Sequence, residues 1–292
     1  MENKNNKWGI DDNSPQESSS SKKDIKHSVS TVEEIITGQL HSNLVIFAGP
    51  RETGKTVALM RLTHFLKKNR NIKIEPDKNY RTDERYQSSV SAFLDDLHTP
   101  DFSPKRTGKI DFLVLNVFKK SELFCQFLEA PGEAFFDSEN PHDHTFPTYL
   151  TKIMNSNRLN KVFLFFFEEG MLSKSDPMAY SNRLARLVSM MNKKKDDVIV
   201  LYNKADKLRE LFDRNKPNVK EFKKRLYDND NYGDFLGSLK DLGIPVKFVA
   251  YSSGDFRSVP GQETERWIHS DDYYPDTLWR NIERCFKGLK WF

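Results

Sequence analysis

The sequence predicts an α/β protein whose sheet is mostly parallel and whose first strand leads into a phosphate-binding loop. The stretch Asn43–Met60 has the pattern of a short apolar strand, a glycine-framed turn and a helix. Farther along the 292 residues, apolar strand-like runs alternate with helical patterns. This order is typical of parallel sheets covered by helices. A chain of this length can bury the core of one large α/β domain or of two small ones.

The turn within Asn43–Met60 fits the pattern G-x-x-x-x-G-K-[ST]. Its glycines allow backbone N–H groups to converge on phosphate oxygens, and the following helix presents its positive dipole end to them. Lys55 would reach the β- and γ-phosphates, and the Thr56 hydroxyl would ligate Mg²⁺. The predicted nucleotide-binding residues of this stretch are Gly49, Arg51, Glu52, Thr53, Gly54, Lys55, Thr56 and Val57.

The segments before and after this motif are polar. Residues 1–30 are rich in Asn and Ser and predict a flexible tail, because they contain too few apolar residues to offset the entropy of ordering. Residues 31–292 are predicted to form the nucleotide-binding domain, with a short helix at Thr31–Leu40 that has capping-box spacing. Residues 69–107 lack a strong period, and only Val90–Leu97 predicts a helix there. We therefore expect an extended connection, which in a compact domain is usually functional or mobile.

The apolar runs Ile110–Phe118 and Leu123–Leu128 are joined by a short polar link, which predicts one antiparallel β-hairpin. Lys161–Phe167 is almost wholly apolar, as expected for a central parallel strand covered on both faces. The later strands are predicted by short apolar runs, and the later helices by apolar residues at every third or fourth position. They comprise a helix at Leu184–Met191, strands at Val198–Tyr202 and Val246–Tyr251, a charged helical segment between these strands, and a final helix from about Thr277.

Three polar turns follow predicted strands, at Glu129–Glu133, Asn203–Asp206 and Ser252–Gly254. In open α/β sheets, ligands bind outside the carboxyl ends of the strands, so these turns are expected to face one site.

The turn Asn203–Asp206 resembles the guanine-specificity motif N-K-x-D of Ras-like GTPases, and its chemistry explains the match. Asp206 can accept hydrogen bonds from the N1–H and the exocyclic amine of guanine. Adenine offers no N1–H and would leave a buried carboxylate unpaired, at a cost of a few kcal/mol. Asn203 would brace the pocket, and the stem of Lys204 would lie along the base.

From about residue 43 onward, the order and content of these motifs resemble the Ras-like GTPases of the translation-factor-related P-loop class. The resemblance implies a three-layer P-loop NTPase fold, the Ras-like G domain, that binds GTP or GDP with Mg²⁺. Asn203–Asp206 matches the guanine-specificity motif N-K-x-D, and Ser252 and Ser253 match the base-contacting turn loosely. The extended segment, the polar tail and a divergent motif at Glu129 are closer to bacterial families of the double-GTPase type than to eukaryotic Ras proteins.

The resemblance also implies a metal site. The family has a threonine before the antiparallel strand that binds Mg²⁺, and Thr107, 22 residues before Glu129 (129 − 107), is the candidate here; Thr82 and Thr99 are less well placed. The family motif Asp-x-x-Gly appears as Glu129-Ala130-Pro131-Gly132, so its carboxylate is one methylene longer. The predicted metal ligands are Thr56, Thr107 and Glu129.

The predicted catalytic residues are Lys55, Arg51, Gly132 and Glu133. The backbone N–H of Gly132 would contact the γ-phosphate. Glu133 stands where the family has a water-orienting Gln, and Arg51 where Ras-like enzymes usually have a glycine. Arg51 would obstruct assisted hydrolysis or act as an arginine finger in cis. We therefore expect slow GTP hydrolysis.

Charge, apolar runs, cysteines and histidines bear on the partner, the membrane, the compartment and a possible second metal site. The net charge of +4 is too mild to indicate nucleic acid, although it permits such a partner. No apolar run is long enough to span a bilayer, and no signal peptide is visible. Cys125 and Cys285 lie in apolar patterns, which favours reduced thiols and a cytoplasmic location. His142–His144 has a possible metal spacing, but a solvated loop is preferred because no further ligand cluster is evident.

Three functions remain open at this point. The first is a switch that hydrolyses GTP slowly and acts through an unidentified protein effector or regulator. The second is a scaffold that binds GTP or GDP without significant hydrolysis, for which Arg51, Glu129 and Glu133 are the motivation. The third, a P-loop ATPase or kinase, is disfavoured by Asn203 and Asp206.

Overall fold

The structure is a computed structural model that describes residues 39–98, 112–136, 145–168, 177–208, 218–228, 232–258, 265–269 and 271–288. Its centre is a seven-stranded sheet in the order β2-β3-β4-β1-β5-β6-β7. The strands are β1 (Asn43–Ala48), β2 (Ile72–Pro76), β3 (Leu113–Lys119), β4 (Glu122–Glu129), β5 (Asn160–Phe167), β6 (Asp196–Tyr202) and β7 (Val246–Ala250). The pairs from β4 through β1, β5 and β6 to β7 are all parallel.

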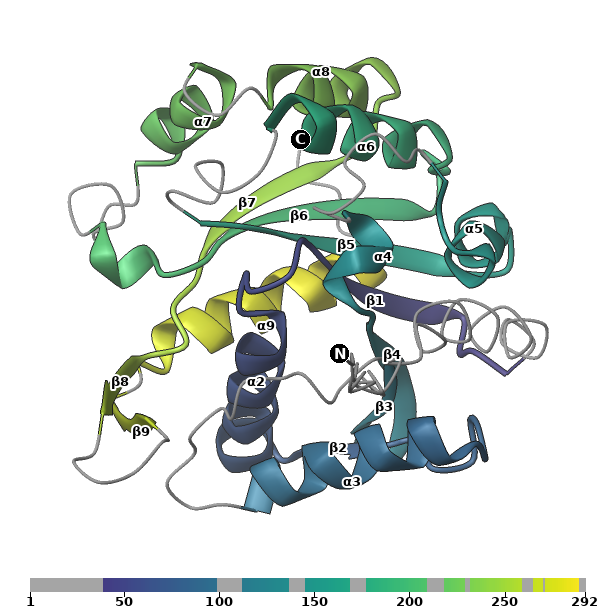
Figure 1. Cartoon of the computed structure of the whole chain (residues 1–292), viewed down its shortest axis with the longest axis vertical. Coiled ribbons are helices and arrows are strands. Elements are labelled where there is room, and N and C mark those ends of the chain that lie inside the picture. The colour runs from purple at the N-terminus through teal and green to yellow at the C-terminus, as the bar shows by residue number, and fades with distance from the viewer. Residues whose placement is uncertain are drawn as a thin grey trace, which may run out of the picture.

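Helices cover both faces of this sheet. They are α2 (Lys55–Arg70), α3 (Glu84–His98), α4 (Gly132–Phe135), α5 (Thr148–Asn155), α6 (Pro177–Ser189), α7 (Val219–Asp228), α8 (Gly233–Asp241) and α9 (Tyr273–Phe286), with a 3₁₀ turn, η3, at Ala205–Lys207. Figure 1 shows α2 and α9 together on one face and α6 and α8 on the other. The result is three layers, with the apolar core on both sides of β1 and β5, whose central residues are fully buried.

This architecture confirms the predicted fold class. The strand, turn and helix around the phosphate loop are β1, the loop and α2, and the predicted hairpin is the antiparallel pair β3–β4. The later strands are β5, β6 and β7, within two residues of their predicted bounds. The charged segment between β6 and β7 contains α7 and α8.

Within residues 69–107, the part that the structure describes contains a strand that was not predicted, and the predicted helix Val90–Leu97 lies within α3. Helix α2 extends to Arg70 and is followed at once by β2, which pairs antiparallel with β3. Ile72, Ile74 and Pro76 of β2 are buried, while Lys73 is exposed. A five-residue edge strand gives too short an alternation to be recognised, and its pairing with β3 is what stabilises it.

Helix α3 is also longer than the predicted Val90–Leu97. Its first turns are polar in sequence, but the Asp83 carboxylate accepts a hydrogen bond from the backbone N–H of Tyr86 at 3.0 Å and caps the helix. Tyr86 is buried, and its hydroxyl donates to the Asp77 carbonyl at 2.8 Å. The helix therefore starts six residues earlier because of a cap and one buried aromatic side chain.

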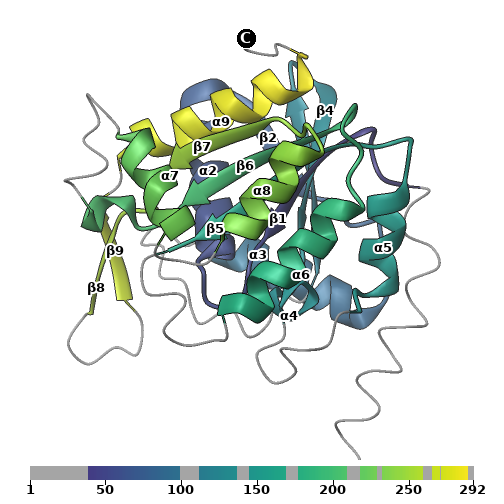
Figure 2. The ribbon, with the colours of Figure 1, turned by 90° about the horizontal axis from the view of Figure 1, so that it is seen from above.

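Two features near the C-terminal end were not predicted. Helix α9 begins at Tyr273 rather than Thr277, and Pro275 lies in its first turn, where a missing N–H costs nothing. Before it, β8 (Asp255–Ser258) and β9 (Glu265–His269) form a separate antiparallel ribbon. Figures 1 and 2 show this ribbon projecting away from the central sheet.

Several expectations lie outside the described residues. These are the tail 1–30, most of the helix Thr31–Leu40, the candidate Thr107, and His142–His144. Among the described helices, none has the length and apolar character that crossing a membrane requires. Cys125 and Cys285 are both free thiols, the first buried and the second half-buried.

Candidate nucleotide-binding site

The predicted site residues gather at the carboxyl ends of the central strands. Strand β1 leads into the phosphate loop, and its residue Phe47 lies in register with Glu129 at the end of β4. The backbone N–H of Asn203 donates to the Phe167 carbonyl at 2.7 Å, which joins the ends of β6 and β5. Turns separated by up to 150 residues in sequence thus share one edge of the sheet.

The phosphate loop is closed around the ammonium group of Lys55. Its Nζ donates to the carbonyls of Gly49 and Pro50 at 3.0 and 2.9 Å, and the Thr53 hydroxyl donates to the same Pro50 carbonyl at 2.9 Å. Burial lowers the pKa of Lys55 to about 8, against the opposing charges of Glu129 and Glu133. The loop therefore keeps a cation at its centre, mostly charged at neutral pH, where phosphate oxygens would bind.

Gly54 allows the phosphate loop to approach the turn Asn203–Asp206 closely. Its φ of 79° lies in the left-handed region, and a Cβ there would lie 2.5 Å from Nδ2 of Asn203. That amide group donates to the Thr53 carbonyl at 2.9 Å and is almost fully buried. Asn203 thus holds the phosphate loop and the N-K-x-D turn together, a contact that the sequence could not specify.

Glu129 contacts the loop directly. The Thr56 hydroxyl donates to Oε1 of Glu129, whose side chain is 4% exposed. Burial raises the pKa of Glu129 to about 7, and this outweighs the hydrogen bond from Thr56 and the charge of Lys55, which lower it. The second oxygen, Oε2, is buried without a hydrogen-bond partner among the described residues. A hydroxyl beside a carboxylate with a spare oxygen suits Mg²⁺, so these two residues fit that ion.

Gly132 packs against the phosphate loop at Arg51. A Cβ on Gly132 would lie 2.6 Å from Cα of Arg51 and from the Pro50 carbonyl carbon, so only glycine fits there. Next to it, the guanidinium of Arg51 and the carboxylate of Glu133 form an ion pair at 3.5 Å. The structure therefore brings together all four predicted catalytic residues.

The turns Asn203–Asp206 and Ser252–Gly254, which are predicted to contact the guanine base and are called the base-side turns, lie beside each other. The backbone N–H of Ala205 donates to the Tyr251 carbonyl at 2.9 Å, which places Asn203–Asp206 against Ser252–Gly254. Asp206 is partly exposed, whereas Ser252 and Ser253 are buried. The Ser252 hydroxyl accepts from the Gly254 N–H at 3.2 Å, and the Ser253 hydroxyl has no partner among the described residues.

The remaining predicted residues flank these groups. Glu52 is exposed in the loop with a φ of 66°, and Val57 is half-buried in the first turn of α2. Lys204 has a φ of 57°, and its side chain is half-exposed.

Sequence reasoning missed two residues of this edge. Glu168, directly after β5, forms an ion pair with Lys204 and so restrains the side chain predicted to lie along the base. Tyr251 is fully buried, and its hydroxyl donates to the Ala58 carbonyl at 3.1 Å, tying the end of β7 to α2. A carboxylate directly after an apolar strand was the available signal for Glu168, while Tyr251 looked like ordinary strand material.

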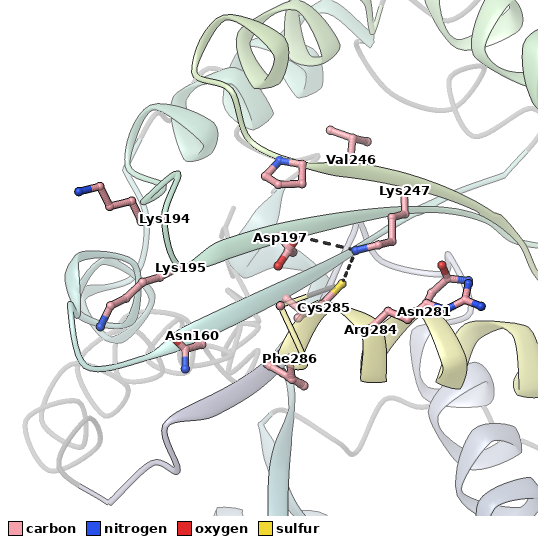
Figure 3. Close-up of a pocket in the computed structure, with 13 residues that line it drawn as sticks. Asn160, Lys194, Lys195, Asp197, Val246, Lys247, Asn281, Arg284, Cys285 and Phe286 are labelled. Carbon is pink, nitrogen blue, oxygen red and sulfur yellow. Dashed lines mark hydrogen bonds and ion pairs between the residues drawn. The ribbon is translucent and has the colours of Figure 1, made fainter. Parts of the chain in front are cut away.

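A cavity of about 840 Å³ lies elsewhere, between the amino ends of β5–β7 and the last turns of α9. Figure 3 shows the ammonium group of Lys247 between Asp197, at 3.7 Å, and the sulfur of Cys285, at 2.9 Å. The side chains of Lys194 and Lys195 point away from this group. The cavity has no glycine loop, its central cation is already paired, and none of the predicted site residues lines it.

No family model matches the chain, and no curated protein matches it. Among solved structures, the chain is similar to a putative nucleolar GTP-binding protein 1 from Plasmodium falciparum, with 14% identity, a TM-score of 0.43, and coverage of 86% of this chain and 89% of that one. The Ski7 GTPase-like domain of S. cerevisiae, bound to GTP, matches with 15% identity, a TM-score of 0.41, and coverage of 84% of this chain and 50% of that one. The signal recognition particle receptor SRb-GTP/SRX complex from Chaetomium thermophilum matches with 13% identity, a TM-score of 0.40, and coverage of 76% and 94%.

The chain thus spans half the length of the Ski7 chain that it matches. At such identities and TM-scores, the likeness decides nothing about activity. Function has to be inferred from the residues of the site.

Proposed function

We propose that the protein binds guanine nucleotides with Mg²⁺, hydrolyses GTP slowly and acts as a nucleotide-dependent switch. One observation carries this proposal: the amide of Asn203 donates to the Thr53 carbonyl at 2.9 Å. This hydrogen bond joins a phosphate-binding loop and a guanine-type turn into a single site. A surface turn that matched N-K-x-D by chance would have no reason to bind the loop.

Each end of the nucleotide would have its own partners. Backbone N–H groups of the loop and the Lys55 ammonium would bind the phosphates, since Lys55 already lies within the loop. Asp206 would accept from the guanine N1–H and amine, with Lys204 along the base, and the backbone at Ser252 and Ser253 would meet the guanine carbonyl. A buried serine hydroxyl without a partner, as at Ser253, is consistent with that assignment.

Thr56 and Glu129 would hold Mg²⁺, with Thr107 as the further ligand implied by the resemblance. A bound Mg²⁺ would supply positive charge to neutralise the β- and γ-phosphate oxygens. The buried Oε2 of Glu129 without a hydrogen-bond partner supports this assignment.

Hydrolysis would be an in-line attack of water on the γ-phosphate. Lys55 would stabilise the developing charge, and the N–H of Gly132 would orient the γ-phosphate. Glu133 is the residue placed to orient water, but it carries negative charge and is ion-paired with Arg51. Because Glu133 is negatively charged and already paired with Arg51, we expect slow turnover. This ion pair is also the observation that supports the second candidate, a GTP- or GDP-binding scaffold without significant hydrolysis.

A switch acts through a protein that reads its state. We place the segments that would change with the nucleotide at Gly132 and near Thr107. The effector or regulator would be a cytoplasmic protein in contact with one of them.

The test is competition between GTP and ATP for the wild type and for Asp206→Asn, with Asp241→Asn at the exposed end of α8 as control. An amide in place of the Asp206 carboxylate cannot accept from both guanine donors, so we expect the preference for GTP to fall by about 100-fold, equivalent to 2–3 kcal/mol. The control should keep the preference of the wild type. An unchanged preference in Asp206→Asn would refute the guanine assignment.

Turnover separates the two candidates. Single-turnover cleavage of GTP slower than about 1 s⁻¹, and abolished in Lys55→Ala, is the result expected for a slow GTPase. Tight guanine binding without phosphate release would favour the scaffold instead.

A further inference from the structure

Arg51 in the phosphate loop and Glu133 on α4 form an exposed ion pair. Their charged groups lie 3.5 Å apart, and the two side chains are 71% and 48% exposed. Arg51 belongs to the loop itself, whereas Glu133 lies on α4, which follows β4. The pair therefore connects the two segments between which the terminal phosphate of a nucleotide would lie, if the proposed function holds.

The backbone on either side of this pair is firmly placed. Gly132 is in such close contact with Arg51 that no side chain fits between them. Behind α4, Arg183 donates through Nη2 to the carbonyls of Ala134 and Thr145 at 3.4 and 2.9 Å. Phe135, at the end of α4, is buried in the core. Because α4 is held from both sides, the approach of Glu133 to Arg51 follows from the backbone and not from side-chain reach alone.

We infer that the Arg51–Glu133 ion pair is a latch in which the two side chains bridge the phosphate loop and α4 and slow the release of bound nucleotide. This inference rests on the proposed function. Exposed ion pairs contribute about 0.2–1 kcal/mol, so the expected effect on a dissociation rate is about 1.4- to 5-fold. Neither residue is required for base recognition, which depends on Asp206 at the other end of the site.

The latch makes a prediction that simple charge effects do not. If the two charges acted independently on the phosphates, removal of Arg51 would speed release, and removal of the negative Glu133 would slow it. If they act as a latch, both removals speed release, because either one breaks the same contact. The sign of the effect of Glu133→Gln is therefore decisive.

The experiment measures the dissociation rate of a fluorescent GDP analogue by chase with excess GDP. Arg51→Ala and Glu133→Gln should each raise the rate by about 1.4- to 5-fold, and the double variant should be no faster than the faster single variant. The charge-reversed double variant, Arg51→Glu/Glu133→Arg, should return toward the wild-type rate.

A matched control is the exposed ion pair Lys73–Glu75 on β2, at 2.6 Å with side chains 69% and 40% exposed. Glu75→Gln removes a similar surface pair far from the site and should leave the rate unchanged. Slower release from Glu133→Gln, or effects of the two single variants that simply add, would overturn the latch. Failure of the wild type to bind guanine nucleotide would overturn the proposed function, and the latch with it. Guanine binding that depends on Asp206, together with the wrong sign for Glu133→Gln, would overturn the latch alone.

Discussion

The two ends of the parallel strands bury polar groups in different ways. At the carboxyl ends, Oε2 of Glu129, Oδ1 of Asn203 and the hydroxyl of Ser253 are buried without hydrogen-bond partners in the described part of the chain. At the amino ends, Lys161 and Asp196 are completely buried but form an ion pair at 3.1 Å. Lys161 also donates to two carbonyls at 3.2 Å.

The backbone does not distinguish the two ends. Glu52, Gly54 and Lys204 have φ between 57° and 79° at the carboxyl ends, and Lys120, Ser121 and Gly243 have φ between 52° and 67° in turns before β4 and β7. Buried polar atoms without partners cost stability, and they call for a ligand, an ion or a water as partner. The comparison teaches that a buried charge paired with its counterion, as in Lys161–Asp196, serves the fold, whereas the unpartnered polar atoms beside the phosphate loop are where we expect a ligand.

The largest expected effect is at the amino edge. Lys161→Met leaves Asp196 buried without its cation, and burial already raises the pKa of Asp196. We expect a loss of about 3–5 kcal/mol in the free energy of unfolding, measured with urea. Lys194→Met, which removes an exposed lysine from the neighbouring turn, should change it by less than about 0.5 kcal/mol.

If the amino edge serves the fold only, the folded fraction of Lys161→Met will keep its preference for GTP over ATP. Replacing both partners, as in Lys161→Met/Asp196→Leu, should recover part of the lost stability, since no charge then stays buried alone. A Lys161→Met protein as stable as the wild type would break the comparison.

At the carboxyl edge, Glu129 should make stability depend on pH. Its pKa is raised from 4.5 to about 7 in the folded protein, so the folded state keeps a proton that the unfolded state loses. Its contribution therefore falls as pH rises from about 4.5 through 7. Without nucleotide or Mg²⁺, we expect a loss of about 2–3 kcal/mol between pH 5 and pH 7.5.

Urea unfolding at several pH values tests this, with Glu129→Gln expected to lack that part of the decline. Glu122→Gln, an exposed carboxyl at the other end of β4, is the control and should follow the wild type. Identical pH profiles for the wild type and Glu129→Gln would show that the buried carboxyl is not held in the protonated form.

The smallest effect is expected at the cavity beside α9. Lys247→Met removes the cation between Asp197 and Cys285, where all three side chains are only partly buried. We expect a loss of about 1 kcal/mol or less in stability and no change in nucleotide affinity, measured by fluorescence titration. A tenfold loss of GTP affinity would mean that the two edges are coupled. It would contradict the interpretation that the amino ends of the strands serve only the fold.

Much of the fold could be predicted because its signals are local. The phosphate loop is one continuous motif from Gly49 to Thr56, and the apolar run Lys161–Phe167 indicates a strand covered on both sides wherever it lies in the sheet. Local signals failed at β2, whose five residues become a strand only by pairing with β3.

The candidate site also has features that the sequence predicts and features that only the fold decides. The sequence by itself determined which groups are available: the glycines of the loop, Lys55, the carboxylate of Glu129 and the turn Asn203–Asp206. Only the tertiary structure decided which of them touch, as in the bonds of Asn203 to Thr53 and of Thr56 to Glu129, and the ion pair of Arg51 with Glu133. The physical reason is that residue type and short-range spacing set the local conformation of the backbone. Contacts between residues 73 to 150 positions apart depend on the order and register of the strands that carry them.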